Sequence, residues 1–380
     1  MSRRQTTLFA LCLLGACDSN DASGGDTEAT TGGPTSTGVA TTPGTTNPAT
    51  TATTEDPTAD SSSSTTGATG GSTIGPEDDT GTTEGSSSTG TAVEMPNVDL
   101  SDPQLYEFSF RADEADPEAT QVLVPQAAYL DTTVEPIGQL VVFLHGAGTQ
   151  SNCARPDHGR MLAGLGFHVV MPCYLSDYGV GNCGDDIGGC RLEAFEGVDH
   201  HDHINVGPSD STETRVVRAL EYLQAEHPGG DWEFFTDGET PRYEHIVVSG
   251  SSHGASTSAL IGMNRSVRRV VSLAGPLDSG QAWLLGDPMT PIDRFYAFTH
   301  TGDNQHEGHL VSFEDLGMVG EPTVVDGAEP PYGDSHRLVS SAPTGNGHGA
   351  VTAGSSSPME NDEWVFLPVW ATMYGADIPR

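Results

Sequence analysis

The chain has 380 residues and carries 53 acidic residues against 15 basic ones, a formal net charge of −38. All 15 basic residues are arginines, so any reaction that needs a lysine nucleophile or a lysine Schiff base is excluded. Nucleic acid and anionic lipid headgroups are not expected as partners, because affinity for phosphate depends on cationic contacts. The length alone allows two or three domains, but the composition is too uneven for that number.

The first 16 residues have the pattern of an export signal. Residues 1–4 form a short basic segment. Residues 6–16 form a mostly apolar run, which is shorter than the ~20 residues that a helix needs to span a bilayer. Leu14-Gly15-Ala16-Cys17 resembles the bacterial lipobox, in which the cysteine is lipidated and becomes the mature N-terminus. The resemblance implies a lipid anchor at Cys17 as the only membrane contact, on a protein of the bacterial cell envelope that faces the periplasm or the exterior. An ordinary signal peptide that happens to contain Cys17 is the alternative.

Residues 17–95 form a predicted tether. Almost all of them are Thr, Ser, Gly, Ala, Pro, Asp or Glu, and none is aromatic. Such a segment cannot bury enough apolar surface to offset its ordering entropy, so we expect it to be disordered, with a span of roughly 50 Å. After this segment 41 acidic and 13 basic residues remain. The globular part therefore has a formal charge of about −28.

Residues 96–380 fit one large α/β domain. Short strands are expected first. After them, continuous apolar runs, which are typical of buried strands, alternate with segments that have the periodicity of a helix. The predicted strands are 105–110, 121–125, 139–144, 167–171, 244–249, 267–273, 294–299 and 322–325, and the predicted helices are 211–226, 255–263 and 361–374. This alternation predicts a mostly parallel central sheet with helices on both faces.

The strongest local signal is Gly250-Ser251-Ser252-His253-Gly254, a G-x-S-x-G motif between a buried strand and a helix. In this context the central serine sits on a strained turn, and the glycines two residues away avoid a clash. We therefore predict Ser252 as the nucleophile and Gly250 and Gly254 as the glycines of the elbow. Ser251 is the rival, but it lacks the glycine spacing.

With this motif the sequence resembles the α/β-hydrolase superfamily over most of residues 105–375. The stretches 191–199, 250–254 and 270–278 resemble a poorly characterised group of bacterial secreted serine hydrolases. The resemblance implies the α/β-hydrolase fold and an acyl-transfer enzyme without a cofactor. His253 departs from the pattern, since many relatives carry Gln or Met there; the position contributes mainly its backbone N–H, so activity is not put in doubt.

An oxyanion hole is expected beside the nucleophile. His145-Gly146-Ala147-Gly148 follows the first central strand and resembles the H-G-x-G turn of the family. The resemblance assigns the two donors to the backbone N–H groups of Ala147 and His253. The loss of one such donor typically costs about 3–4 kcal/mol of transition-state stabilisation.

The orienting acid and the base follow the nucleophile in the order Ser, Asp, His. Asp303 comes just after the predicted strand 294–299, where the family places its acid, and His348 lies in a late glycine-rich loop, where it places its base. The competing acids are Asp278, Asp326 and Asp334, and the competing histidines are His336 and His306.

Four cysteines lie in the globular part: Cys153, Cys173, Cys183 and Cys190. An even number in an exported domain suggests disulfides, and four cysteines allow three pairings. We favour Cys183–Cys190, which closes a short loop, and Cys153–Cys173 then follows. Free buried thiols are the alternative.

These features together predict an esterase-like serine hydrolase that acts on a small-molecule or polymer-borne ester. Residues 173–208 are the expected cap or binding insert. One alternative is a binding module that kept the fold without catalysis. The other is a metal-dependent hydrolase that uses the Asp and His residues of 199–203, although their order is not the H-x-H-x-D-H pattern of metallo-hydrolases, and no metal is expected.

Overall fold

The computed structural model describes residues 94–148 and 152–378. The predicted signal peptide, Cys17 and all of the predicted tether except its last two residues lie outside the described residues. Among the described residues, no helix is long and apolar enough to cross a membrane.

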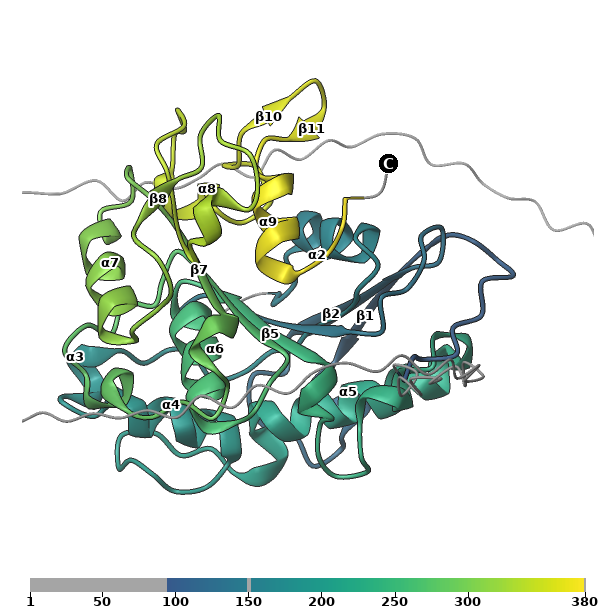
Figure 1. The fold of residues 1–380 in the computed structure, drawn as a ribbon. Coiled ribbons are helices and arrows are strands. Elements are labelled where there is room, and N and C mark those ends of the chain that lie inside the picture. Colours follow the sequence, from purple (N-terminus) through teal and green to yellow (C-terminus); the bar gives the residue numbers. More distant parts are fainter. Residues whose placement is uncertain (1–93, 149–151, 379–380) are drawn as a thin grey trace, which may run out of the picture. The chain divides into compact units, whose positions relative to one another are not determined.

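A nine-stranded sheet runs through the described part of the chain (Figure 1), in the order β1-β2-β4-β3-β5-β6-β7-β9-β8. Its strands are β1 (Leu105–Arg111), β2 (Pro125–Asp131), β3 (Leu140–Leu144), β4 (His168–Met171), β5 (Ile246–Ser251), β6 (Arg269–Leu273), β7 (Phe295–His300), β8 (Thr323–Val324) and β9 (Arg337–Ser340). β2 pairs antiparallel with both β1 and β4, and every other pairing is parallel. This order, with a G-x-S-x-G turn after β5, is the α/β-hydrolase fold.

Helices cover both faces of the sheet, with α2 and α9 on one face and α5 and α6 on the other (Figure 1). The helices are α1 (Ala112–Ala115), α2 (Pro156–Gly164), α3 (Val180–Cys183), α4 (Ile187–Glu196), α5 (Thr212–Glu226), α6 (His253–Asn264), α7 (His306–Asp315), α8 (Gly347–Ala350) and α9 (Leu367–Tyr374). Short 3-10 turns connect several of them, and a small hairpin of β10 (Met359–Glu360) and β11 (Glu363–Trp364) precedes α9.

The alternation of side chains along β3 explains why both faces are covered. All five residues of β3 are buried. Leu140, Val142 and Leu144 belong to the core on the side of α5 and α6, whereas Val141 and Phe143 belong to the core on the side of α2 and α9. A strand that buries both of its faces reads as a continuous apolar run, which is why the sequence predicts it.

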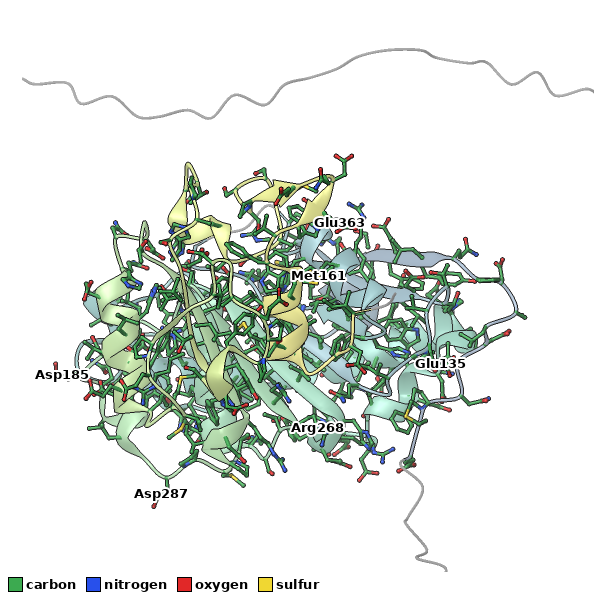
Figure 2. All side chains as sticks on the ribbon, turned by 45° about the horizontal axis from the view of Figure 1, so that its top comes forward. Glu135, Met161, Asp185, Arg268, Asp287 and Glu363 are labelled. Atoms are coloured by element: carbon green, nitrogen blue, oxygen red, sulfur yellow. A yellow bond between two sulfur atoms is a disulfide. The ribbon has the colours of Figure 1, made fainter. Side chains whose placement is uncertain are left out.

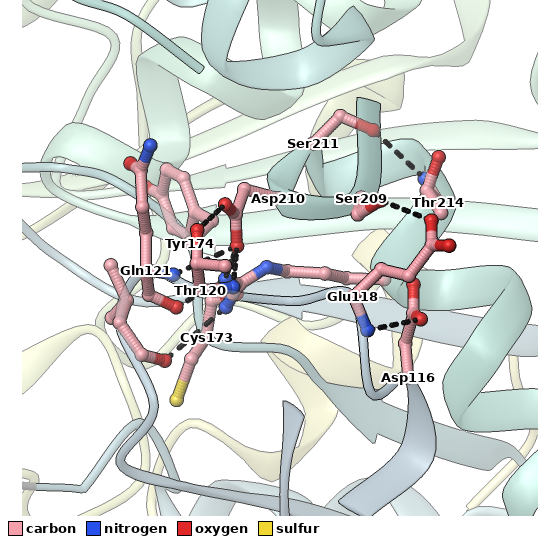
Figure 3. A network of polar contacts seen from close by, with 12 residues as sticks. Asp116, Glu118, Thr120, Gln121, Cys173, Tyr174, Ser209, Asp210, Ser211 and Thr214 are labelled. Atoms are coloured by element: carbon pink, nitrogen blue, oxygen red, sulfur yellow. Dashed lines mark hydrogen bonds and ion pairs between the residues drawn. The ribbon is translucent and has the colours of Figure 1, made fainter. Parts of the chain in front are cut away.

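The predicted strand at 121–125 is wrong, because a polar network fixes this segment in another shape (Figure 3). Val122 has a φ of +44°, which no strand accommodates. The buried Asp210 accepts hydrogen bonds from the backbone N–H groups of Thr120 and Gln121, both at 2.9 Å, and pairs with Arg215 at 2.8 Å. Although burial opposes it, this set of bonds holds the pKa of Asp210 below its usual value.

Other elements differ from the expectations in position or were not expected. β2 starts at Pro125, where the predicted strand ends, and β9, which lies between β7 and β8, was not predicted. The helix expected at 361–374 begins only at Leu367. The unexpected helices α2, α4 and α7 are rich in Gly, His or Asp, which are weak helix formers.

Both favoured disulfides are present in the structure. The Cα atoms of Cys153 and Cys173 are 5.3 Å apart, and those of Cys183 and Cys190 are 6.4 Å apart. The second bridge fastens α3 to α4.

Several acidic side chains lie at the surface. Asp185, Asp287 and Glu363 are exposed and project outward in Figure 2. Because like charges repel, this acidic surface favours solubility over self-association.

Candidate active site

The nucleophile elbow lies between β5 and α6. Ser252 has a φ of +59° and a ψ of −119°, a strained conformation for a residue with a side chain. A Cβ atom on Gly250 would lie closer than 3.0 Å to the backbone of Gly254, and a Cβ atom on Gly254 would lie as close to the carbonyl group of Leu144. Glycine is therefore required at both positions, as the motif predicts.

The predicted acid and base are hydrogen-bonded to each other. His348 Nδ1 donates to Asp303 Oδ2 over 2.7 Å. The carboxylate of Asp303 is fully buried, whereas the His348 ring is 36% exposed. The other carboxylate oxygen accepts a hydrogen bond from the backbone N–H of Gln305 at 2.9 Å. With Nδ1 protonated in this bond, His348 Nε2 carries the lone pair that a general base needs.

A glycine lets the loops of the acid and the base approach each other. His348 belongs to the short helix α8, which Asn346 caps by accepting from the backbone N–H of Gly349. A Cβ atom on Gly347 would lie closer than 3.0 Å to the backbone of Gly302 and Asp303. Glycine at position 347 is thus a condition for the bond between Asp303 and His348.

The competing acids have other partners or lie at the surface. Asp278 forms a bidentate ion pair with Arg191, at 2.7 and 2.9 Å. Asp326 accepts from the hydroxyl groups of Ser340 and Ser341, at 2.6 and 2.8 Å. Asp334 is exposed.

The competing histidines also have other contacts. His336 stacks on Tyr296 with ring centroids 3.8 Å apart, and its Nδ1 donates to the carbonyl of Phe295. His306 Nδ1 lies 3.3 Å from Thr299 Oγ1. Of the three histidine rings, only that of His348 is hydrogen-bonded to the carboxylate of Asp303 in the described part of the chain.

Ser252 and His348 line one cavity of about 480 Å³, which the rival Ser251 also lines. Ser252 Oγ makes no hydrogen bond to His348 among the described residues, and such bonds often form only with substrate bound. Ser252 also lines a second cavity of about 210 Å³, and Ala147 lines both. A larger hollow of about 650 Å³ beside α9 is lined by none of the predicted site residues.

One of the two predicted oxyanion donors, the backbone N–H of His253, lies at the start of α6. His253 is the first residue of this helix, so its N–H has no acceptor within the helix, and none of the other described residues accepts it. The helix N-terminus also favours negative charge at this point. The assignment of this N–H as an oxyanion donor stays a prediction.

The turn that carries Ala147 is fixed by its neighbours. Gly148 N donates to the carbonyl of Ser176 at 3.0 Å, and the Ser176 hydroxyl donates to the carbonyl of Gly146 at 3.2 Å. His145 Nδ1 donates to the same carbonyl at 2.8 Å. Burial lowers the pKa of His145 to about 4, so this histidine is neutral near pH 7.

The side chain of His253 has a structural role. The Tyr174 hydroxyl donates to the carbonyl of His145 at 2.9 Å and therefore accepts from His253 Nδ1 at 3.0 Å. Burial, and then the charge of Arg191, lowers the pKa of His253 well below its usual value. The buried ring of His253 thus belongs to the packing directly after Ser252.

Sequence reasoning missed a positioning role for Arg191. Its Nη1 donates to the carbonyl of His253 at 3.1 Å and to Thr257 Oγ1 at 3.0 Å, while the rest of the guanidinium binds Asp278. Arg191 and Asp278 are each 3% exposed. The buried pair thus holds the first turn of α6 beneath the elbow. The two residues are 87 positions apart, and no local pattern marks them as partners.

The Asp and His residues of 199–203 do not gather into a metal site. His200 Nε2 bonds Glu196 at 2.9 Å, and His201 Nε2 donates to the carbonyl of Cys183 at 3.1 Å. Among the described residues, one group of three potential ligands lies close enough to share an ion: Cys183, Cys190 and His201. Its two cysteines form a disulfide, so their thiolates cannot bind a metal.

No protein-family model matches the chain, and no curated protein matches it. Among solved structures, a protein from Klebsiella pneumoniae described as a dienelactone hydrolase is 11% identical, with a TM-score of 0.33 over 68% of this chain and 93% of that chain. A variant of the feruloyl esterase module from Clostridium thermocellum, complexed with sinapinate, is 12% identical, with a TM-score of 0.35 over 66% of this chain and 83% of that chain. The fold assignment rests on the strand order and the elbow rather than on these similarities.

Proposed function

We propose that the protein is a serine hydrolase that cleaves esters through a covalent acyl-enzyme. The observation that carries the proposal is the 2.7 Å bond between Asp303 and His348, whose ring lines the same cavity as the strained Ser252. A nucleophile, a base and a buried acid that orients the base are the components of acyl transfer.

The first half of the reaction forms the acyl-enzyme. His348 Nε2 takes the proton of Ser252 as Oγ attacks the ester carbonyl carbon. The backbone N–H groups of His253 and Ala147 stabilise the oxyanion of the tetrahedral intermediate. Asp303 keeps the proton on Nδ1 and stabilises the imidazolium. The intermediate then collapses, the C–O bond to the alcohol breaks, and His348 gives its proton to the departing oxygen.

Water completes the cycle by the same groups. His348 Nε2 removes a proton from water, whose oxygen attacks the acyl carbon, and the proton passes to Ser252 Oγ as the acid is released. No metal or cofactor takes part in either half.

The experiment that tests this proposal compares two neighbouring serines. Ser252→Ala is expected to lower kcat for a 4-nitrophenyl ester by about 10⁶-fold, the effect of losing a triad nucleophile. Ser251→Ala, the matched control, is expected to keep kcat within a few-fold. Full activity of Ser252→Ala would refute the proposal, whereas an unaltered protein that turns over no ester would favour the binding module without catalysis.

The proposal includes export and anchoring through lipid at Cys17, with the residues before 96 as a tether. The disulfides support export, because such bonds persist in oxidising compartments. Metabolic labelling with a fatty acid tests the anchor: the full chain is expected to take up label and Cys17→Ser to lose it, whereas label retained in the variant would contradict it.

A further inference from the structure

The two cavities that meet at Ser252 differ in their lining. We name the 210 Å³ cavity the acyl lobe, after its apolar side chains Tyr178, Val180, Ile187 and Leu277. The 480 Å³ cavity is the alcohol lobe, after its polar side chains Asn346, Thr352, Ser355 and Ser356. We propose, on the basis of the function above, that the acyl group binds in the first and the alcohol in the second. The preferred substrate is then an ester of a short, largely apolar acid with a hydroxyl-rich alcohol.

The position of the base gives the orientation. His348 must hand its proton to the oxygen of the departing alcohol, so that oxygen lies on the His348 side of Ser252. His348 lines the alcohol lobe and does not line the acyl lobe. His253, the oxyanion donor, lines the acyl lobe and does not line the alcohol lobe. An ester carbonyl at Ser252 therefore has its acyl chain directed toward α3 and α4.

The acyl lobe suits a short apolar chain. Its volume is less than half that of the alcohol lobe, which favours a short acyl chain. The charges at its wall, Arg191 and Asp278, neutralise each other. Val180 is 46% exposed, and the Cys183–Cys190 disulfide fastens its helix to the start of α4. Apolar contact with a bound chain would cover this exposed side chain.

The alcohol lobe suits hydroxyl groups. No apolar side chain larger than alanine lines it among the described residues. Its polar groups include the Arg155 guanidinium, the Asn346 amide and the hydroxyls of Ser355 and Ser356. These donors and acceptors can bond the hydroxyls of a polyol or sugar, whereas an alkyl alcohol would leave them unpaired at a cost in affinity.

Burst kinetics separate the two lobes, because deacylation depends on the acyl group alone after the alcohol has left. With 4-nitrophenyl acetate, butanoate and octanoate, Val180→Trp is expected to lower the deacylation rate for octanoate at least 10-fold and to spare acetate. Val311→Trp, at an equally exposed valine on α7 outside both lobes, is the control and is expected to keep the chain-length profile.

The second arm keeps the acyl group constant and changes the alcohol. The unaltered enzyme is expected to prefer glycerol monobutanoate to butyl butanoate by at least 10-fold in kcat/KM. Ser355→Trp is expected to lower that ratio and to leave the deacylation rate of the butanoyl-enzyme unchanged. Ser266→Trp, at an exposed serine next to β6, is the control.

The outcomes distinguish this inference from the proposed function. Loss of all turnover in the Ser252→Ala protein together with a chain-length profile that Val180→Trp changes would support both. If Ser252 is required but Ser355→Trp changes the chain-length profile and Val180→Trp does not, the assignment of the lobes is overturned and the function stands. An unaltered enzyme that prefers butyl butanoate also overturns it. Full activity of Ser252→Ala overturns the function itself.

Discussion

At the scale of single residues, the proposed acid Asp303 has well-defined contacts. It is fully buried, and it accepts the Nδ1 proton of His348 and the backbone N–H of Gln305. A second buried histidine, His309, lies 4.0 Å from the same carboxylate, and its Nδ1 bonds Thr299 Oγ1 at 2.8 Å. Burial lowers the pKa of His309 to about 4, although the charge of Asp303 opposes this shift. His309 is therefore neutral near pH 7.

Asp303→Asn is expected to lower kcat by about 10⁴-fold, because the amide no longer holds the Nδ1–H tautomer of His348. Asp334→Asn, at an exposed rival, is expected to leave kcat within a few-fold. Steady-state kinetics with one 4-nitrophenyl ester measures both. The assignment of the acid fails if the two variants exchange these results.

Some of the residues predicted from the sequence are marked by a local pattern. The elbow glycines and Ser252 were predictable because one turn of five residues holds all the steric constraints. Asp303 and His348 are 45 residues apart, and the order of residues in the superfamily, rather than the physics of the chain, pointed to them. Arg191 and Asp278 were not paired in advance, because only the tertiary fold brings them together.

At the scale of elements, the site depends on where three strands end. β5 ends at the elbow, β3 at the oxyanion turn and β7 just before Asp303. Parallel strands bring these ends to one edge of the sheet. α8 joins them only because Gly347 packs against the backbone after β7.

Gly347→Ala tests this packing. The added Cβ would force α8 away from Gly302 and Asp303, so we expect kcat/KM to fall by at least 100-fold. Gly345→Ala is the matched control, because a Cβ there meets nothing within 4 Å. Steady-state kinetics measures kcat/KM of both variants, and circular dichroism checks that both are folded. An active Gly347→Ala enzyme would show that the contact does not position the base.

The elements that were not predicted have weak local signals. β2 reads Pro-Gln-Ala-Ala-Tyr-Leu-Asp, without a β-branched residue, and it is a strand because its backbone pairs with β1 and β4 on either side. β9 has four residues and forms a strand because β7 and β8 flank it. Tertiary pairing rather than propensity makes both of them strands.

At the scale of the whole molecule, five buried histidines dominate the expected response to pH, and one of them is His253, whose pKa burial lowers well below its usual value. Burial lowers the pKa of His145, His168 and His309 to about 4 and that of His158 to about 3. Hydrogen bonds favour the neutral form of His158, because its Nδ1 accepts from the backbone N–H of Ala353 and so carries no proton. Its Nε2 lies 3.0 Å from the Tyr374 hydroxyl.

The folded protein therefore binds protons less readily than the unfolded chain, whose histidines have a pKa near 6.5. The stability from these groups is fully present above about pH 6.5 and is lost as the pH falls toward 4. Each histidine contributes a slope of about 1.4 kcal/mol per pH unit in this window. Urea unfolding at pH 8, 7, 6 and 5 measures it, with the exposed His203→Gln variant as a control. A free energy of unfolding that is flat from pH 7 to 5 would contradict the prediction.

Covalent capture of the nucleophile tests the central claim most directly. Residues 96–380, exported to an oxidising compartment so that both disulfides form, would be incubated with a fluorescent fluorophosphonate, beside Ser252→Ala and Ser251→Ala. The account predicts one labelled peptide that carries the probe on Ser252, unchanged in Ser251→Ala and absent in Ser252→Ala. Folded protein that takes up no probe, or takes it up at another residue, would contradict it.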